Sequence, residues 1–430
     1  MIKKSKILLI EPPFQKFMDF SKAYMPMGLL SLATTLQRQG HEVQVYDMDY
    51  NPLGQSLPFV EKIEHYHAYI EALNGSNHPV WQNLNEVANR FQPNIVGISM
   101  ISTKLKSGLK VAERLRRTGI ERIIAGGVHA TIDPEEIIES PYIDGVVSGE
   151  GEEVFEHAVE NGGIVKAPAI LDINKLGWIA RDSLVNLSQY DPKDLGMVMS
   201  SRGCPYSCNF CSSPTLWGQT VRNREISDVV AEIEDVHDRY GVNEFYIIDD
   251  TFTVKKSRVL EFCERMKNKG LTWSCLTRVN VVDKEVVHTM KESGCHLVKV
   301  GLESGSERVL KLMNKRIKKE DTRNAARLFR ENGLDWMAYF IVGVPGETIE
   351  EVDETIAFIE EIKPTFISFS NFTPYPGTEF YREMGLGRIE YHRFNHHSAE
   401  QTGQIPIEKI LDVAKFADDY NQNSKEESKR

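Results

Sequence analysis

The chain has 430 residues, of which 41% are hydrophobic and 26% are charged, and its net charge is −11. That charge argues against a nucleic-acid partner bound through phosphates, and no apolar run approaches the ~20 residues of a membrane span. Three of the six cysteines lie close together, which favours a metal site in a reducing, cytoplasmic environment over a disulfide scaffold.

The first part of the chain alternates between strand and helix patterns. Strands are expected at residues 6–10, 42–46, 94–100, 122–125 and 145–147, and helices at 28–39, 104–117, 134–140 and 152–160. This alternation predicts an α/β domain over residues 1–165 with a doubly wound, flavodoxin-like parallel sheet. Ligands of such sheets bind outside the carboxyl ends of the strands, where uncommon polar and glycine residues gather at 11–13, 99–103, 126–129 and 148–152.

Residues 166–195 show little periodicity and are expected to form a linker. A second alternation over residues 196–385 predicts strands at 197–200, 244–248, 272–277, 296–301, 336–342 and 366–371, and helices at 227–240, 257–269, 284–293, 321–332 and 349–362. Six strand–helix units predict a partial (β/α)6 barrel of the TIM type, with its chemistry at the carboxyl ends of the strands. Residues 386–430 are expected to form a substrate-side region that ends in a polar, disordered tail from residue 421.

A cysteine motif follows the first barrel strand, with Cys204, Cys208 and Cys211 in a loop that also holds Gly and Pro. Thiolates are the usual ligands of iron–sulfur clusters, and three of them leave one iron of a [4Fe–4S] cluster open for a substrate or cofactor. A closed zinc site would need a fourth ligand, which is not evident nearby, and packing cysteines do not normally lie in such a loop. The motif therefore favours a cluster.

The spacing C-x3-C-x2-C, with the aromatic Phe210 before the third cysteine, resembles the signature of the radical S-adenosylmethionine (SAM) superfamily. The resemblance implies that the open iron holds SAM and that electron transfer cleaves it to a 5′-deoxyadenosyl radical. It also implies SAM contacts at later strand ends. These are Asp249 and Asp250 near the amino group, Arg278 at the carboxylate, Glu303 and Ser304 near the ribose and carboxylate, and Ile341, Gly343 and Pro345 beside the adenine.

Segments of the first domain, at residues 25–33, 126–131 and 149–152, resemble the cobalamin-binding domain of one large radical SAM class. Glycine-rich strand ends can approach a flat macrocycle closely. The D-x-H-x-x-G motif of classical cobalamin domains is replaced by residues 11–16, which offer no histidine to cobalt. The cobalamin contacts that the resemblance implies are Ser99, Thr103, Gly126, Gly127, His129, Gly149 and Glu150, and Trp217 either packs the barrel or borders the cavity between the domains.

The class contains methylases of unactivated carbon or phosphorus, so the resemblance implies cobalamin-dependent C-methylation of a small-molecule substrate. An electron donor such as flavodoxin or ferredoxin is expected as partner. One alternative is a cobalamin-independent radical dehydratase, dehydrogenase or epimerase of a sugar-like substrate, in which the first domain is vestigial. Another is a non-catalytic iron–sulfur or corrinoid sensor. The scattered Cys263, Cys275 and Cys295 are expected to be buried packing residues.

Overall fold

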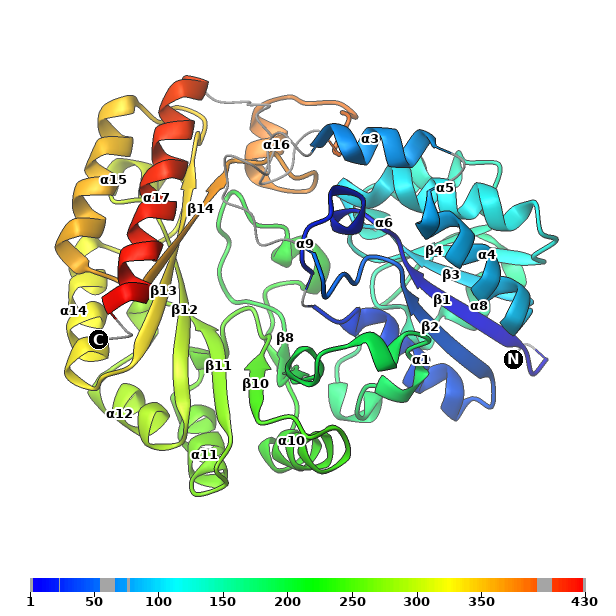
Figure 1. Ribbon diagram of the computed structural model, residues 1–430, viewed down its shortest axis with the longest axis horizontal. Helices are drawn as coiled ribbons and strands as arrows, with labels where there is room; N and C mark the ends of the chain where they lie inside the picture. Colours follow the sequence, from blue (N-terminus) through cyan, green and yellow to red (C-terminus); the bar gives the residue numbers. More distant parts are fainter. Residues whose placement is uncertain (1–2, 23, 55–65, 76–77, 393–403, 428–430) are drawn as a thin grey trace.

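The computed structural model describes residues 3–22, 24–54, 66–75, 78–392 and 404–427. Two six-stranded parallel sheets dominate them, the first in blue to cyan and the second in green to orange (Figure 1). The first sheet has the order β2-β1-β3-β4-β5-β6, which confirms the doubly wound prediction. Its strands are β1 (Lys6–Glu11), β2 (Glu42–Asp47), β3 (Ile95–Ser99), β4 (Arg122–Gly126), β5 (Gly145–Ser148) and β6 (Gly163–Lys166).

Helices cover both faces of the first sheet, so its strands are apolar on both sides. In β1, Ile7 and Leu9 join one core cluster, while Leu8 and Ile10 join the other, and all four are fully buried. The helices are α1 (Met27–Arg38), α3 (Tyr66–Asn74), α4 (Pro79–Phe91), α5 (Leu105–Arg116), α6 (Val128–Ile132), α7 (Pro134–Ile138) and α8 (Phe155–Asn161). The pattern along the sequence had not indicated α3 and α4.

The second sheet has the order β14-β13-β12-β11-β10-β7, with every pair parallel, so it is the predicted partial barrel. Its strands are β7 (Met197–Val198), β10 (Glu244–Ile247), β11 (Thr272–Thr277), β12 (Cys295–Glu303), β13 (Asp335–Val342) and β14 (Phe366–Asn371). Soon after β7 along the chain, β8 (Ser201–Arg202) begins a two-stranded antiparallel ribbon with β9 (Arg222–Asn223). The helices are α9 (Ser213–Trp217), α10 (Ile226–Tyr240), α11 (Lys256–Met266), α12 (Lys284–Glu292), α13 (Glu307–Leu312), α14 (Lys319–Glu331), α15 (Ile349–Ile362) and α16 (Glu379–Glu383).

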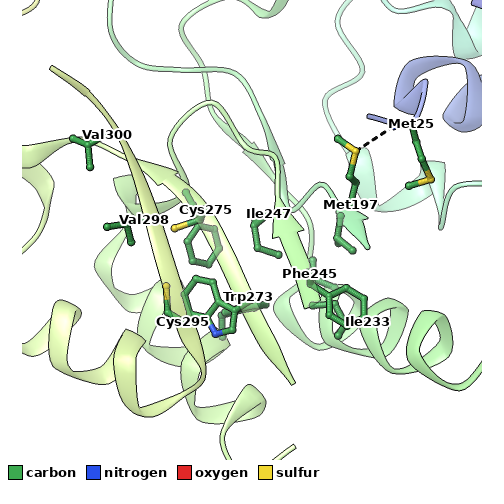
Figure 2. Packing of buried hydrophobic residues seen from close by; sticks show 14 of the residues in the cluster. Met25, Met197, Ile233, Phe245, Ile247, Trp273, Cys275, Cys295, Val298 and Val300 are labelled. Atoms are coloured by element: carbon green, nitrogen blue, oxygen red, sulfur yellow. Dashed lines mark hydrogen bonds between the residues drawn. The ribbon is translucent and has the colours of Figure 1, made fainter. Parts of the chain in front are cut away.

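The outer face of the second sheet packs on its helices. Trp273 lies at the centre of this core, with its ring centroid 5.0 Å from that of Phe262 on α11 (Figure 2). Cys263, Cys275 and Cys295 are all buried among these residues, which confirms their predicted packing role. The core reaches the first half of the chain, because the amide of Met25 lies 3.3 Å from the sulfur of Met197 on β7.

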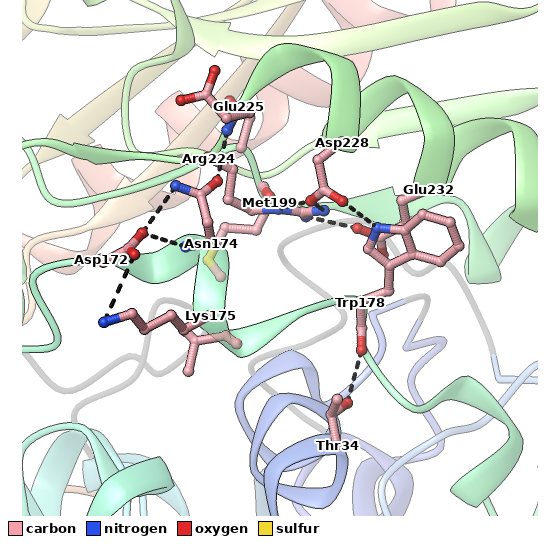
Figure 3. Close-up of polar contacts among 12 residues, drawn as sticks. Thr34, Asp172, Asn174, Lys175, Trp178, Met199, Arg224, Glu225, Asp228 and Glu232 are labelled. Atoms are coloured by element: carbon pink, nitrogen blue, oxygen red, sulfur yellow. Dashed lines mark hydrogen bonds and ion pairs between the residues drawn. The ribbon is translucent and has the colours of Figure 1, made fainter. Parts of the chain in front are cut away.

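The segment between the sheets is more ordered than a linker. It contains four short 3-10 helices, and Trp178 fastens it to both halves of the molecule (Figure 3). The Trp178 indole donates to Asp228 on α10 at 2.9 Å, and its carbonyl accepts from Thr34 on α1 at 2.8 Å. The segment that joins the two sheets is therefore ordered and is held to both of them through Trp178.

The carboxyl-terminal region also differs from expectation. A long helix, α17 (Ile407–Glu427), packs on β14, where Asn421 pairs with both the amide and the carbonyl of Ile367 at 2.9 and 2.8 Å. The polar residues from 421 to 427 are thus helical rather than disordered. No helix among the described residues is long and apolar enough to cross a membrane.

Candidate functional site

The cysteine loop leaves the β8–β9 ribbon through a tight turn. Gly203 has φ +101°, and a Cβ at this position would lie 2.4 Å from the carbonyl oxygen of Thr220. Glycine is therefore required here on both conformational and steric grounds. Further along the loop, the amide of Asn209 donates to the carbonyl oxygen of Met313 at 2.9 Å, which fixes the loop against the end of α13.

The loop presents Cys204, Cys208 and Cys211 as free, partly exposed thiols. Burial raises the pKa of Cys204 and raises that of Cys211 to about 12, with smaller contributions from the neighbouring thiols. Among the described residues, no three His, Cys, Asp or Glu side chains converge closely enough to hold a single metal ion.

A buried cation borders the thiols. Nη1 of Arg278 lies 3.7 Å from Sγ of Cys208, and the guanidinium stacks over the ring of Tyr206 at 3.8 Å. A second hydrogen bond, from Nη2 to the carbonyl oxygen of Lys315, fixes its direction. Arg278 thus places a positive charge beside the open side of the cysteine loop, where it suits a carboxylate.

The two acids at the end of β10 have different surroundings. Asp249 is 1% exposed and accepts four hydrogen bonds of 2.5–3.0 Å from the amides and hydroxyls of Ser200 and Ser201. Its carboxylate holds the segment between β7 and β8 against the end of β10, so the structure argues against the expected contact with SAM. Asp250 is exposed, and one of its oxygens accepts from Ser213 at 2.5 Å. Asp250 is the acid available to a ligand.

The end of β12 is strained. Glu303 has φ +70°, in a region that non-glycine residues rarely adopt, and a bulge precedes it at Gly301. Its carboxylate forms a buried ion pair with Lys315 at 2.5 Å, and Ser304 lies 3.2 Å from the hydroxyl of Thr355 on α15. Backbone strain that its surroundings hold in place is a common feature of ligand sites.

The segment after β13 meets the cysteine loop. Ile341 and Phe210 pack in one small apolar cluster, and Pro345 lies partly exposed in the following turn. Gly343, with φ +85°, donates its amide to Glu347 at 2.7 Å, and the next amide donates to the same oxygen at 3.2 Å. Burial nevertheless raises the pKa of Glu347 to about 7. The structure therefore brings the expected adenine segment beside the aromatic residue of the cysteine motif.

A cavity of about 580 Å³ lies at the carboxyl edge of the first sheet. Gly28 adds open space, because a Cβ there would meet no atom within 4 Å. Trp217 and Tyr375, from the second half of the chain, also line the cavity. Of the two placements expected for Trp217, the structure therefore shows the one at the border of the cavity. The lining includes the expected Ser99, Thr103, Gly126, Gly127, Gly149 and Glu150. This glycine-rich surface suits a flat macrocycle.

His129 lies away from this lining, which corrects its expected place. It is fully buried, with Nδ1 3.0 Å from the hydroxyl of Ser102 and Nε2 3.0 Å from the carboxylate of Glu136. Tyr391 covers the ring at a centroid distance of 5.0 Å. With both ring nitrogens engaged, His129 is a structural residue behind the strand ends.

The carboxylate of Glu150 is also already occupied. It accepts from Arg202 at 2.6 Å and from Arg222, and Arg202 bonds Glu152 at 2.6 Å as well. We call Glu150, Glu152, Arg202 and Arg222 the interdomain clamp; all four side chains are buried. Neither arginine was predicted from the sequence, because the ion pairs join positions at least 50 residues apart. The one signal in the sequence was a charged residue, Arg202, two positions before Cys204.

Comparisons with known proteins agree with this geometry. The model of the radical SAM superfamily matches residues 198–359, and that of the B12 binding domain matches residues 20–159. An uncharacterised methyltransferase of Pyrococcus horikoshii is 31% identical over 409 residues, which cover 88% of this chain and 83% of the relative. The cytidylyl-2-hydroxyethylphosphonate methyltransferase of Streptomyces wedmorensis is 27% identical, over 97% of this chain and 90% of the relative.

A solved structure is similar over both halves. The radical SAM methyltransferase TsrM of Kitasatospora setae, with cobalamin and a [4Fe–4S] cluster bound, has a TM-score of 0.69 at 19% identity, covering 89% of this chain and 75% of TsrM. At this identity the likeness supports the fold, and the family rests on the sequence matches. The chain therefore belongs to the radical SAM superfamily, in the class of enzymes that combines the radical SAM domain with a B12-binding domain.

Proposed function

We propose that the chain is a cobalamin-dependent methyltransferase that places a methyl group on an unactivated carbon of a small-molecule substrate. Per turnover, the substrate C–H bond becomes C–CH3 and one SAM becomes S-adenosylhomocysteine. A second SAM, with two electrons from a donor such as flavodoxin or ferredoxin, becomes methionine and 5′-deoxyadenosine. When bound, the cluster supplies one-electron reduction of SAM and cobalamin supplies a cobalt centre for methyl transfer.

One observation carries the proposal: the cavity of about 580 Å³ at the first sheet is lined in part by residues adjoining the cysteine loop. Arg202, two residues before Cys204, and Trp217, six residues after Cys211, both line it. A corrin in this cavity would therefore lie next to a cluster on the loop. A vestigial first domain gives no reason for a large, glycine-lined cavity to open there.

Four groups of this chain fit SAM. Arg278 offers a fixed cation to the SAM carboxylate, and Asp250 offers an exposed carboxylate to its ammonium group. Glu303, held by its left-handed backbone and its ion pair with Lys315, would lie toward the ribose. A Cβ at Gly343 would meet only Cδ1 of Ile410, at 3.9 Å, so this turn could admit the adenine ring. These side chains would bind and orient SAM, and Trp217 and Tyr375, which line the cavity, would limit the access of water to bound cofactors.

The test is anaerobic reconstitution of the full chain with iron, sulfide and hydroxocobalamin, followed by metal analysis. We expect about four irons and one cobalt per chain. Incubation with methyl-deuterated SAM, a reductant and pools of candidate small molecules should then give labelled product together with S-adenosylhomocysteine and 5′-deoxyadenosine. Iron without cobalt would remove cobalamin and leave the radical dehydratase alternative, and binding of both without any turnover would favour the sensor.

A further inference from the structure

Polar side chains share the inner face of the second sheet, opposite its helix-covered face. The strand register places Tyr246 of β10, Lys299 of β12 and Tyr339 of β13 on this face, with Ser368 and Ser370 of β14 beside them. None of the five is fully buried. The neighbouring positions face outward into the apolar core seen in Figure 2, and they are Ile247, Cys275, Val298, Val300 and Ala338.

Lys299 is the one cation of this group and lacks an anionic partner. Its ammonium nitrogen lies 3.7 Å from the ring centroid of Tyr246, over the ring face. Across the described part of the chain, its side chain makes no hydrogen bond or ion pair. Burial lowers the pKa of Lys299 more than the nearby Cys275 and Glu244 raise it, so its charge is held at a cost that a bound anion would relieve.

Two phenols accompany this ammonium. Burial raises the pKa of Tyr246 and of Tyr339, so both hydroxyls stay protonated and can donate. Within the described residues, neither hydroxyl has a hydrogen-bond partner, and the same is true of Ser368 and Ser370. Tyr24, from the first half of the chain, is near enough to raise the pKa of both phenols further. Unsatisfied donors around one cation are the arrangement that an acidic ligand group completes.

The position of this group separates it from the expected SAM contacts. Lys299 precedes Gly301 by two residues on β12, and Tyr339 precedes Ile341 by two on β13, so both lie deeper in the barrel than the strand ends. The cation suited to the SAM carboxylate is Arg278, which lies against the cysteine loop instead. The inner-face group therefore remains for the substrate.

We propose that Lys299, together with the hydroxyls of Tyr246 and Tyr339, binds an acidic group of the substrate, either a carboxylate or a phosphonate or phosphate. This rests on the proposed function in that a substrate must enter the barrel beside SAM. An ammonium is a compact charge that serves all these oxyanions, and the phenols add directed hydrogen bonds. The substrate class is thus a small organic acid whose anionic end reaches into the barrel and whose reacting carbon lies toward the strand ends.

The test is a ligand-observed NMR titration of the reconstituted enzyme with three probes of similar size: propionate, ethylphosphonate and the neutral propionamide. We expect at least one acid to bind and propionamide not to bind. Lys299→Met should weaken the acid by about tenfold or more, because a hydrogen bond to a charged group is worth about 1.5–3 kcal/mol. Lys299→Arg should keep most of the affinity, and Tyr246→Phe should lower it less than Lys299→Met.

The matched control is Lys267→Met, at an exposed position after α11, which should leave binding unchanged. Acid binding that survives Lys299→Met would overturn the proposal, as would the absence of binding by either acid, or a loss of SAM affinity with acid binding intact. Propionate and ethylphosphonate together separate a carboxylate site from a phosphonate site. The iron and cobalt contents of the same samples show whether the protein is folded and holds both cofactors. Normal metal contents without acid binding would contradict only the acid site, whereas a lack of cobalt would contradict the proposed function.

Discussion

The acids at the two sheet edges are stabilised in different ways. At the first edge, Asp49 is fully buried, yet Lys104, 2.9 Å away, and Lys22 outweigh its burial and keep its pKa below the usual value. At the second edge, Asp249 and Glu347 are bonded to hydroxyls and amides rather than to cations, and burial raises the pKa of both.

The difference shows at which edge the buried acids already have cationic partners. At the first edge, Asp49 is paired within its own domain, while Glu150 and Glu152 take their cations from the interdomain clamp. The charges around the mainly apolar cavity are thus compensated before any ligand enters, which suits a large macrocycle. At the second edge, Glu303 is paired with Lys315, but Asp249 and Glu347 form no ion pair among the described residues, and neither does Lys299 deeper in the barrel. Groups perturbed in this manner are typical of sites that act on charged ligands.

The largest expected effect comes from removing a thiol, which should affect the second edge and leave the first intact. Cys208→Ala should eliminate reductive cleavage of SAM and reduce the iron content from about four per chain toward zero, because the remaining two thiols cannot hold the cluster. Cobalt content should persist, since the first edge is complete without the cluster. The control is Cys263→Ala, at a buried packing site, which should retain iron. If Cys208→Ala kept its iron, the loop would not be the cluster site.

The interdomain clamp joins the two edges, and cutting it should be the next largest effect. Arg202→Met leaves Glu150 and Glu152 buried without one of their cations, so we expect a loss of about 3–5 kcal/mol in the free energy of unfolding. Chemical denaturation of the cofactor-free chain measures it. Arg239→Met, whose partner Asp182 is exposed, should cost less than about 1 kcal/mol. Equal losses would mean that the clamp adds nothing beyond a surface pair.

Filling the cavity tests whether the first edge is preformed. Gly28→Trp adds a ring where a side chain meets no atom within 4 Å, so it should compete with cobalamin and weaken binding by about tenfold or more, as overfilling costs about 1–3 kcal/mol. Iron content should not change. Gly28→Ala is the matched control and should bind cobalamin normally. Unchanged cobalt in the Trp variant would place the corrin elsewhere.

The smallest expected effect concerns the uncompensated acid Glu347. Its pKa in the folded chain is raised to about 7, so its contribution to stability is fully present below its unfolded pKa and is lost as pH rises through about 7. Between about pH 5 and about pH 8, the free energy of unfolding of the wild type should therefore fall by about 1–2 kcal/mol more than that of Glu347→Gln. Thermal unfolding at both pH values measures the difference, and parallel curves for the two proteins would contradict it.

Much of the fold followed from periodicity. The predicted strands at 272–277 and 366–371 match β11 and β14, and the predicted helix at 349–362 matches α15, where Thr348 and Glu351 form a capping box. Periodicity and capping residues are local features, so they can be recognised from the sequence alone. The order of the connection before β7 was not evident from the sequence, because its 3-10 turns lack a repeating pattern and are held by distant partners of Trp178.

The site was predictable in part for the same reason. Spacing predicted the cysteine ligands, but it could not separate Asp249, which bonds Ser200 and Ser201, from its neighbour Asp250, which is exposed. Nor could it show that His129 points away from the cavity or that Lys299 has no anionic partner among the described residues. Those facts depend on strand register and side-chain direction, which are fixed by the assembled sheets.

The interdomain clamp has a consequence for how such proteins can be recombined. Arg202 belongs to the entrance of the cysteine loop, while Glu150 and Glu152 belong to the glycine-rich loop of the other domain. A chimera that exchanges either domain with a relative would inherit one half of this ionic contact and confront it with a foreign surface. The two loops of this chain therefore act as one unit, and an exchange of either domain would have to carry both loops or rebuild the contact.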